Sequence, residues 1–154
     1  MQSLFVRADA EAMVARYGEQ SATALATVEQ RILKHYQRIA GKQAPLPSLL
    51  LVQAPIFHGH AFALHLEMEE APDIEAMTRG LVGEHVNVTH LAEDSPSNVN
   101  AAGQGDVLVS ILPDANLATG LWLWAAADNL RIAATTAVEC AESMAASRPR
   151  GQIQ

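Results

Sequence analysis

The stretch GLWLWAAADNLRIAATTAVECAE, residues 120–142, decides the fold of this chain. Its first part, residues 120–127, is apolar, starts at a glycine and contains two tryptophans, which predicts a β-strand. Apolar residues then recur at three- and four-residue spacing, which predicts a helix from residue 129 to about 146. Trp122 and Trp124 fall on one face of the strand, where they pack either in the core or in an interface.

The rest of the chain predicts further regular elements. Strands are expected at residues 49–52, 61–68, 86–91 and 106–112, and helices at residues 9–17, 21–39 and 74–82. Gly41 is the expected stop after the second of these helices, and Asp73 the expected N-cap of the third. The strand at 61–68 has a period of two, so one of its sides is expected to be packed, either in the core or in an interface. That side consists of Phe62, Leu64, Leu66 and Met68.

This order of elements predicts one α+β domain over residues 1–154. A largely antiparallel sheet with helices packed on one face accounts for the alternating strands and the flanking helices. The opposite face of such a sheet needs a packing partner, and a second copy of the same chain is the simplest one. We therefore expect a homodimer.

Composition excludes several classes of partner. The 154 residues carry a net charge of −7, and the ten Lys and Arg residues form no cluster, so no nucleic-acid partner is expected. No apolar stretch approaches the roughly 20 residues that span a bilayer. Residues 1–13 lack the features of a secretory signal. The single cysteine, Cys140, excludes an internal disulfide and fits the cytoplasm.

Two blocks of sequence carry a resemblance to a known family. VQAPIFHGHAFALHLE, residues 52–67, and the stretch at 120–142 are similar to the two best-marked segments of the C-terminal dimerisation domain of aspartate-semialdehyde dehydrogenases. SPSNVNAAGQGDVLVSILPD, residues 95–114, resembles the loop and strand between them. The likeness covers residues 32–146, strongly after residue 49. Gln-x-Pro followed by Gly-His-Ala is similar to the Usg-type paralogue, a dehydrogenase look-alike.

The resemblance implies a definite chemistry for full-length members of the family. They reduce aspartyl phosphate to the semialdehyde with NADPH, in lysine, methionine and threonine biosynthesis. An N-terminal Rossmann domain binds the nucleotide and carries a cysteine nucleophile, whereas the C-terminal domain supplies an acid/base histidine, a substrate-binding arginine and most of the dimer interface. This chain contains no GxGxxG, so we expect the Rossmann domain to be absent and no cofactor to bind the chain alone.

Two residues of the first block match the catalytic and substrate-binding positions of the family. His60 falls on the acid/base histidine, and its imidazole suits proton transfer near neutral pH. It is alternatively a strand-end histidine that serves local hydrogen bonding. Gln53 stands where the family has the arginine that grips the substrate carboxylate, and a neutral amide cannot replace a charged, bidentate guanidinium. The alternative for Gln53 is an amide that satisfies nearby backbone groups.

Asp128 and Asn129 match the Asp-Asn pair that lies near the nicotinamide in the family, which makes them candidate cofactor-binding residues. The alternative is helix capping, which needs no cofactor. Cys140 is predicted to be a packed small residue in the middle of a helix and not a nucleophile. His58, His60 and His65 lack a completed ligand set, so no metal site is expected.

The leading hypothesis is a dimerisation module that is inactive alone. A second hypothesis is the C-terminal half of an NADP-dependent oxidoreductase acting on an aldehyde or acyl phosphate, with the nucleotide domain supplied by another chain. A third is a small-molecule binding domain that retains the substrate cleft near His60.

Overall fold

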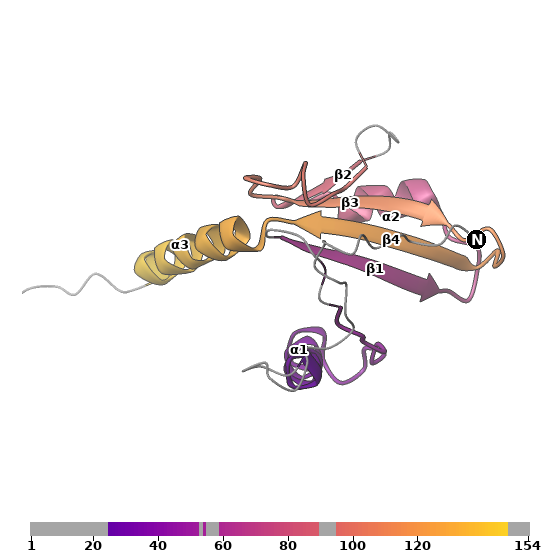
Figure 1. Ribbon diagram of the computed structural model, residues 1–154, viewed down its shortest axis with the longest axis horizontal. Helices are drawn as coiled ribbons and strands as arrows, with labels where there is room; N and C mark the ends of the chain where they lie inside the picture. Colours follow the sequence, from indigo (N-terminus) through magenta and orange to yellow (C-terminus); the bar gives the residue numbers. More distant parts are fainter. Residues whose placement is uncertain (1–24, 53, 55–58, 90–94, 148–154) are drawn as a thin grey trace, which may run out of the picture. The chain divides into compact units, whose positions relative to one another are not determined.

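The structure is a computed structural model that describes residues 25–52, 54, 59–89 and 95–147 (Figure 1). The chain divides into two compact units, residues 1–56 and residues 57–154. The first unit contains α1 (Leu25–Ala40). The second contains β1 (His60–Glu67), α2 (Ile74–Leu81), β2 (Val86–Val88), β3 (Val107–Pro113), β4 (Gly120–Ala127) and α3 (Asn129–Ser147). The helix expected at residues 9–17 lies outside the described residues.

Helix α1 ends where the sequence predicts. Gly41 follows it with a φ of 83°, and the Gly41 N–H donates to the carbonyl oxygen of Gln37 at 3.1 Å. A left-handed residue in this place is the usual C-terminal cap of a helix, and only glycine adopts it without strain. The buried Glu29 of α1 accepts a hydrogen bond at Oε1 from the Leu51 N–H at 2.9 Å.

The strand expected at residues 49–52 is not formed. The Leu51 N–H is bound to the Glu29 carboxylate, and Leu50 and Val52 are 63 % and 47 % exposed. A short apolar run favours a strand only if a second strand supplies hydrogen-bond partners, and that information is not local. This prediction was therefore wrong.

The second unit is built on one mixed sheet with the order β1-β4-β3-β2. The β1/β4 and β4/β3 pairs are antiparallel, and the short β2/β3 pair is parallel. This confirms the predicted α+β class. Strand β4 lies inside the sheet, which explains why residues 120–127 are apolar at nearly every position. Leu121 and Ala126 of β4 are completely buried, and Val109 of β3 is 6 % exposed.

The helices of the second unit differ in how they pack. Helix α2 lies against β2 and β3, and its predicted N-cap is confirmed, because Oδ1 of Asp73 accepts from the Ala76 N–H at 3.0 Å. Helix α3 continues from β4 past the end of the sheet and buries none of its residues (Figure 1). Cys140 is therefore exposed, and its prediction as a packed residue was wrong. The apolar side of α3 is mostly alanine, whose small side chain gains little from burial.

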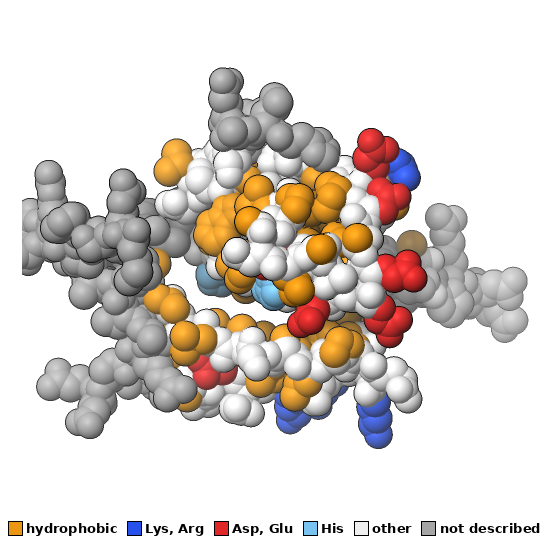
Figure 2. Space-filling model, turned by 90° about the vertical axis from the view of Figure 1, so that its right-hand side faces the viewer, with side chains coloured by type: hydrophobic (Ala, Val, Ile, Leu, Met, Phe, Trp, Pro, Cys, Tyr) orange, Lys and Arg blue, Asp and Glu red, His pale blue; other side chains and the backbone are white. Residues whose placement is uncertain are grey.

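The alternating side of β1 stays largely uncovered. Phe62, Leu64, Leu66 and Met68 are 43 %, 46 %, 38 % and 43 % exposed, and we call these four residues the β1 strip. Figure 2 shows hydrophobic side chains gathered beside histidine on the face that it displays. The sequence predicted that this side of β1 packs, and the described part of the chain does not bury it. Surface of this kind is typical of an interaction site.

The two tryptophans share one face of β4, as predicted, because Trp122 pairs with His65 and Trp124 with Ala63 in the antiparallel register. Trp124 is half-buried, and its Nε1–H donates to the Pro96 carbonyl oxygen at 2.6 Å. Trp122 is 41 % exposed. Trp124 therefore packs against the loop at Pro96, whereas Trp122 lies at the surface.

Candidate functional site

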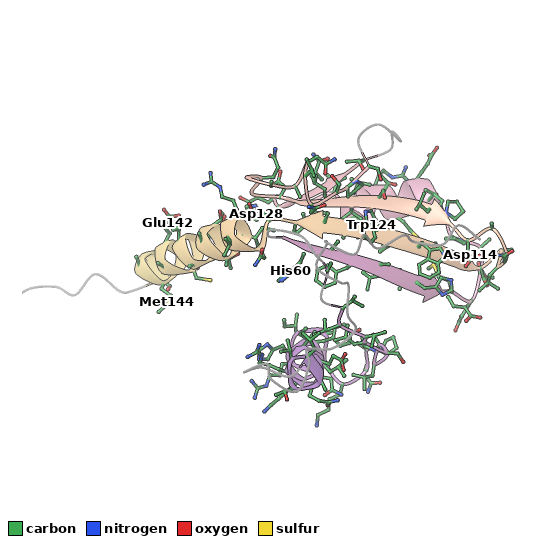
Figure 3. The ribbon with its side chains drawn as sticks, in the orientation of Figure 1. His60, Asp114, Trp124, Asp128, Glu142 and Met144 are labelled. Atoms are coloured by element: carbon green, nitrogen blue, oxygen red, sulfur yellow. The ribbon has the colours of Figure 1, made fainter. Side chains whose placement is uncertain are left out.

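Three of the four predicted site residues meet at one end of the sheet. His60 begins β1 and pairs with Ala127, the last residue of β4, so it lies beside the point where β4 passes into α3. Asp128 and Asn129 occupy that junction, and Figure 3 labels His60 and Asp128 there. Gln53 lies outside the described residues.

Asp128 binds the start of α3 and the loop before β3. Its Oδ1 accepts from the N–H groups of Leu130 and Arg131 at 3.1 and 3.0 Å, which satisfies donors of the first helical turn. Its Oδ2 accepts from the Gly103 N–H at 2.8 Å. The side chain is only 7 % exposed. This is the capping role that the sequence left open, and the cofactor role of Asp128 stays a prediction.

The side chain of Asn129 is hydrogen-bonded to the backbone of Gly59, the residue before His60. Its Oδ1 accepts a hydrogen bond from the Gly59 N–H at 3.0 Å, across 70 positions of sequence. Gly59 has a φ of 101°, and a Cβ there would stand 3.2 Å from the Ala127 carbonyl oxygen and 3.9 Å from Cβ of Asn98. No role was predicted for Gly59 or Asn98 from the sequence. The Gly-His pair was the one signal that pointed to this position.

The imidazole of His60 is exposed. Its ring lies edge-on to Phe62, with centroids 6.3 Å apart and an interplanar angle of 74°. An exposed imidazole can exchange protons with a bound molecule, which is the property that general acid/base catalysis requires.

The loop over residues 95–105 is organised by its own polar side chains. Oδ1 of Asn100 accepts from the N–H and the hydroxyl of Ser97 at 2.6 and 2.9 Å, and Nδ2 of Asn100 donates to the Ser95 carbonyl oxygen at 2.8 Å. Together with the contacts of Gly103 and Pro96, these bonds hold the loop beside the site. The sequence predicted a loop here from its Ser, Asn, Gly and Pro content, but not these contacts.

Comparison with protein families decides the relationship. Residues 13–132 match the family described as semialdehyde dehydrogenase, dimerisation domain. The chain belongs to this family. The dimerisation domain is 35 % identical over 121 residues to aspartate-semialdehyde dehydrogenase of Legionella pneumophila, and 32 % identical over 120 residues to that of Shewanella violacea. Each match covers 74 % of this chain and 35 % of the relative, so the chain spans about a third of the length of these relatives.

Solved structures agree with this relationship. The structure of aspartate semialdehyde dehydrogenase II from Vibrio cholerae has a TM-score of 0.76 and 26 % identity, covering 97 % of this chain and 45 % of that one. A probable aspartate-semialdehyde dehydrogenase from Pseudomonas aeruginosa has a TM-score of 0.70 and 27 % identity, covering 85 % and 40 %. The chain is thus the dimerisation domain of an aspartate-semialdehyde dehydrogenase-like protein, matching the C-terminal part of these enzymes.

The dimerisation domain carries a second polar cluster on the other side of β1. Nε2 of His65 lies 2.9 Å from Oδ2 of Asp114, and the Trp122 Nε1–H donates to the same oxygen at 3.2 Å. The rings of His65 and Trp122 are 4.5 Å apart. The Asn116 N–H donates to Oδ1 of Asp114 at 2.8 Å.

Asp114 should make the stability of the domain depend on acid pH. The Asn116 N–H, and also His65 and Trp122, hold the pKa of the Asp114 carboxyl below its ordinary value of 3.8, although partial desolvation opposes them. A lowered folded-state pKa stabilises the fold above the unfolded pKa, and this contribution is lost as the pH falls through the folded pKa. We expect the stability difference between the wild type and Asp114→Asn to shrink as the pH falls below about 4.

Urea unfolding at a series of pH values measures this difference directly. A difference that stays constant to pH 3 contradicts the assignment.

Other sequence expectations concern metals and membranes. His58 lies outside the described residues, and His60 and His65 point to opposite faces of β1. Among the residues that the structure describes, no group of three or more His, Cys, Asp or Glu side chains could hold a metal ion. Within the same residues, no helix is both long and apolar enough to cross a membrane.

Proposed function

We propose that this chain acts as a homodimerisation domain, with residues 1–154 forming one domain that has no catalytic activity by itself. The observation that carries the proposal is the exposed β1 strip at the edge of the sheet. His60 occupies the acid/base position of the family, but the chain's one cysteine, Cys140, lies exposed in α3 and away from β1. The chain therefore has no cysteine beside His60 to act as the nucleophile in acyl transfer.

The exposed apolar surface of the β1 strip can stabilise a dimer when it is buried. Phe62, Leu64 and Leu66 alternate along β1 and Met68 follows its last residue, so these four side chains, each about two-fifths exposed, form an apolar row. Burial of such surface stabilises association by about 25 cal/mol per Å². Permanent dimers typically bury more than roughly 2,000 Å² in total, so the β1 strip is proposed as the centre of a larger interface.

Introducing a charged side chain into the β1 strip tests whether the strip lies in an interface or in the core. Leu64→Glu is expected to leave the fold intact, since the side chain is already 46 % exposed, and to weaken the dimer by tenfold or more, because a buried unpaired carboxylate costs about 1–3 kcal/mol or more. Light scattering gives the mass of the variant, and circular dichroism gives its fold.

Ala63→Glu is the matched control, since Ala63 is also exposed but faces the other side of β1. We expect this variant to remain dimeric. Unfolding of Leu64→Glu would show that the β1 strip is core, and a dimer lost only in Ala63→Glu would assign the interface to the other face.

The exposed imidazole of His60 favours a second candidate function. Here the chain is the C-terminal half of an NADP-dependent oxidoreductase acting on an aldehyde or acyl phosphate, and another chain supplies the nucleotide domain. A nucleotide-binding half of a Legionella-type relative, mixed with this chain, should then co-migrate with it and restore dehydrogenase activity. No co-migration would remove this candidate.

We further propose that the chain is of the Usg type and works in the cytoplasm. Gln53 in place of the substrate-binding arginine supports the first statement, because a neutral amide cannot hold a carboxylate in the manner of a guanidinium. The absence of a second cysteine, and hence of any internal disulfide, supports the second. Aspartyl phosphate is therefore not the proposed substrate, even with a nucleotide domain present.

A further inference from the structure

The chain reaches His60 through a residue whose backbone is tightly constrained. Gly59 has a φ of 101°, a region that side chains other than that of glycine rarely enter. A Cβ at Gly59 would also press on the carbonyl oxygen of Ala127 at 3.2 Å. Glycine thus lets the chain turn beside the end of β4 and place the next residue, His60, opposite Ala127 in the sheet.

The amide of Gly59 is held by a side chain from a distant part of the sequence. Oδ1 of Asn129 accepts the Gly59 N–H at 3.0 Å in a partly buried position. Asn129 is the first residue of α3, and its backbone is fixed by the helix and by the cap residue Asp128. The acceptor is therefore presented from a rigid place, which is what a positioning contact needs.

From these contacts we infer that Asn129 is a positioning residue for His60: it fixes the Gly59 amide and thereby sets where the imidazole stands at the start of β1. This rests on the proposed function, in which His60 occupies the family's acid/base position. The side-chain oxygen of Asn129 is committed to the backbone of this chain, so its role does not require a nucleotide.

The edge-on contact between the His60 and Phe62 rings gives a readout of position. An aromatic ring shifts the resonances of protons near its plane and edge, so the ring protons of His60 report their distance from Phe62 in an NMR spectrum. Amide hydrogen exchange at Gly59 reports the hydrogen bond itself. Both are measured on the 154-residue chain without substrate or cofactor.

Asn129→Ala is expected to speed exchange of the Gly59 amide by about fivefold or more, because one net hydrogen bond is lost. It should also move the His60 ring resonances away from their wild-type positions. Asn129→Asp keeps an acceptor oxygen and should restore the slow exchange. Asn87→Ala, an exposed substitution in β2, is the matched control and should change neither.

Amide hydrogen exchange at Gly59 can also be measured in the wild type. It therefore tests the hydrogen bond between Gly59 and Asn129 even if Asn129→Ala does not fold. Exchange at the rate of an unprotected amide would overturn the inference. So would a His60 spectrum that is identical in Asn129→Ala and the wild type. The dimer mass is a separate quantity: a monomeric wild type with a protected Gly59 would sink the proposed dimer and leave this contact standing.

Discussion

Replacing Asp128 by alanine is expected to lower the free energy of unfolding by about 2–3 kcal/mol. The variant loses a helix N-cap, which contributes about 1 kcal/mol, and also loses the part-buried hydrogen bond from the Gly103 N–H to a charged acceptor, which contributes about 1.5 kcal/mol. The side chain is 7 % exposed, so water replaces it poorly. Urea or thermal unfolding measures the change.

Asp73→Ala is the matched control for this variant. Asp73 also caps a helix, but it is exposed, and its carboxylate accepts the Ala76 N–H at 3.0 Å. We expect a loss of about 1 kcal/mol or less. Equal losses at the two caps would mean that the bond between Asp128 and Gly103 does not contribute.

Replacing Leu121 by alanine is expected to cost about 3 kcal/mol, within the range of roughly 2–5 kcal/mol for buried leucines. In the described part of the chain, Leu121 is the largest side chain that is completely buried, and it lies in β4 opposite Leu66 and Pro113. Truncation loses apolar burial and leaves a cavity on the face of the sheet. A denaturant series gives the free energy of unfolding.

Leu112→Ala is the control for Leu121, since Leu112 sits in the neighbouring strand β3 but is 53 % exposed. Its expected cost is below about 1 kcal/mol. A loss at Leu112 that equals the loss at Leu121 would contradict the assignment of β4 as the centre of the core.

Local patterns in the sequence predicted most of the regular structure. The strand-to-helix stretch at 120–142 became β4 and α3, and the period of two at 61–68 became β1, because these signals depend only on neighbouring residues. The run at 49–52 failed because a strand exists only with a partner. The exposure of Cys140 was missed because the helix pattern does not say whether another element covers it.

The candidate site was predicted less completely than the fold. Sequence placed His60, Asp128 and Asn129 through family resemblance, and the register of β1 with β4 brings them to one end of the sheet. It could not predict the bond between Gly59 and Asn129, which spans 70 positions, or that between His65 and Asp114, which spans 49. Contacts at such separations depend on the topology of the whole sheet, which local patterns do not encode.

These observations connect the sheet to its proposed role. The central strand β4 carries the buried core, and the edge strand β1 carries both the exposed β1 strip and, at its first residue, His60. One strand would thus join the interface between two copies to the catalytic position of the family.

The most direct test of the dimerisation proposal is the mass of the purified chain in solution, measured by light scattering over a dilution series. We predict a stable mass of about 33 kDa, twice the 16.5 kDa of one chain, that persists to low micromolar concentration. A mass of 16.5 kDa at every concentration would contradict self-association as the role of this domain.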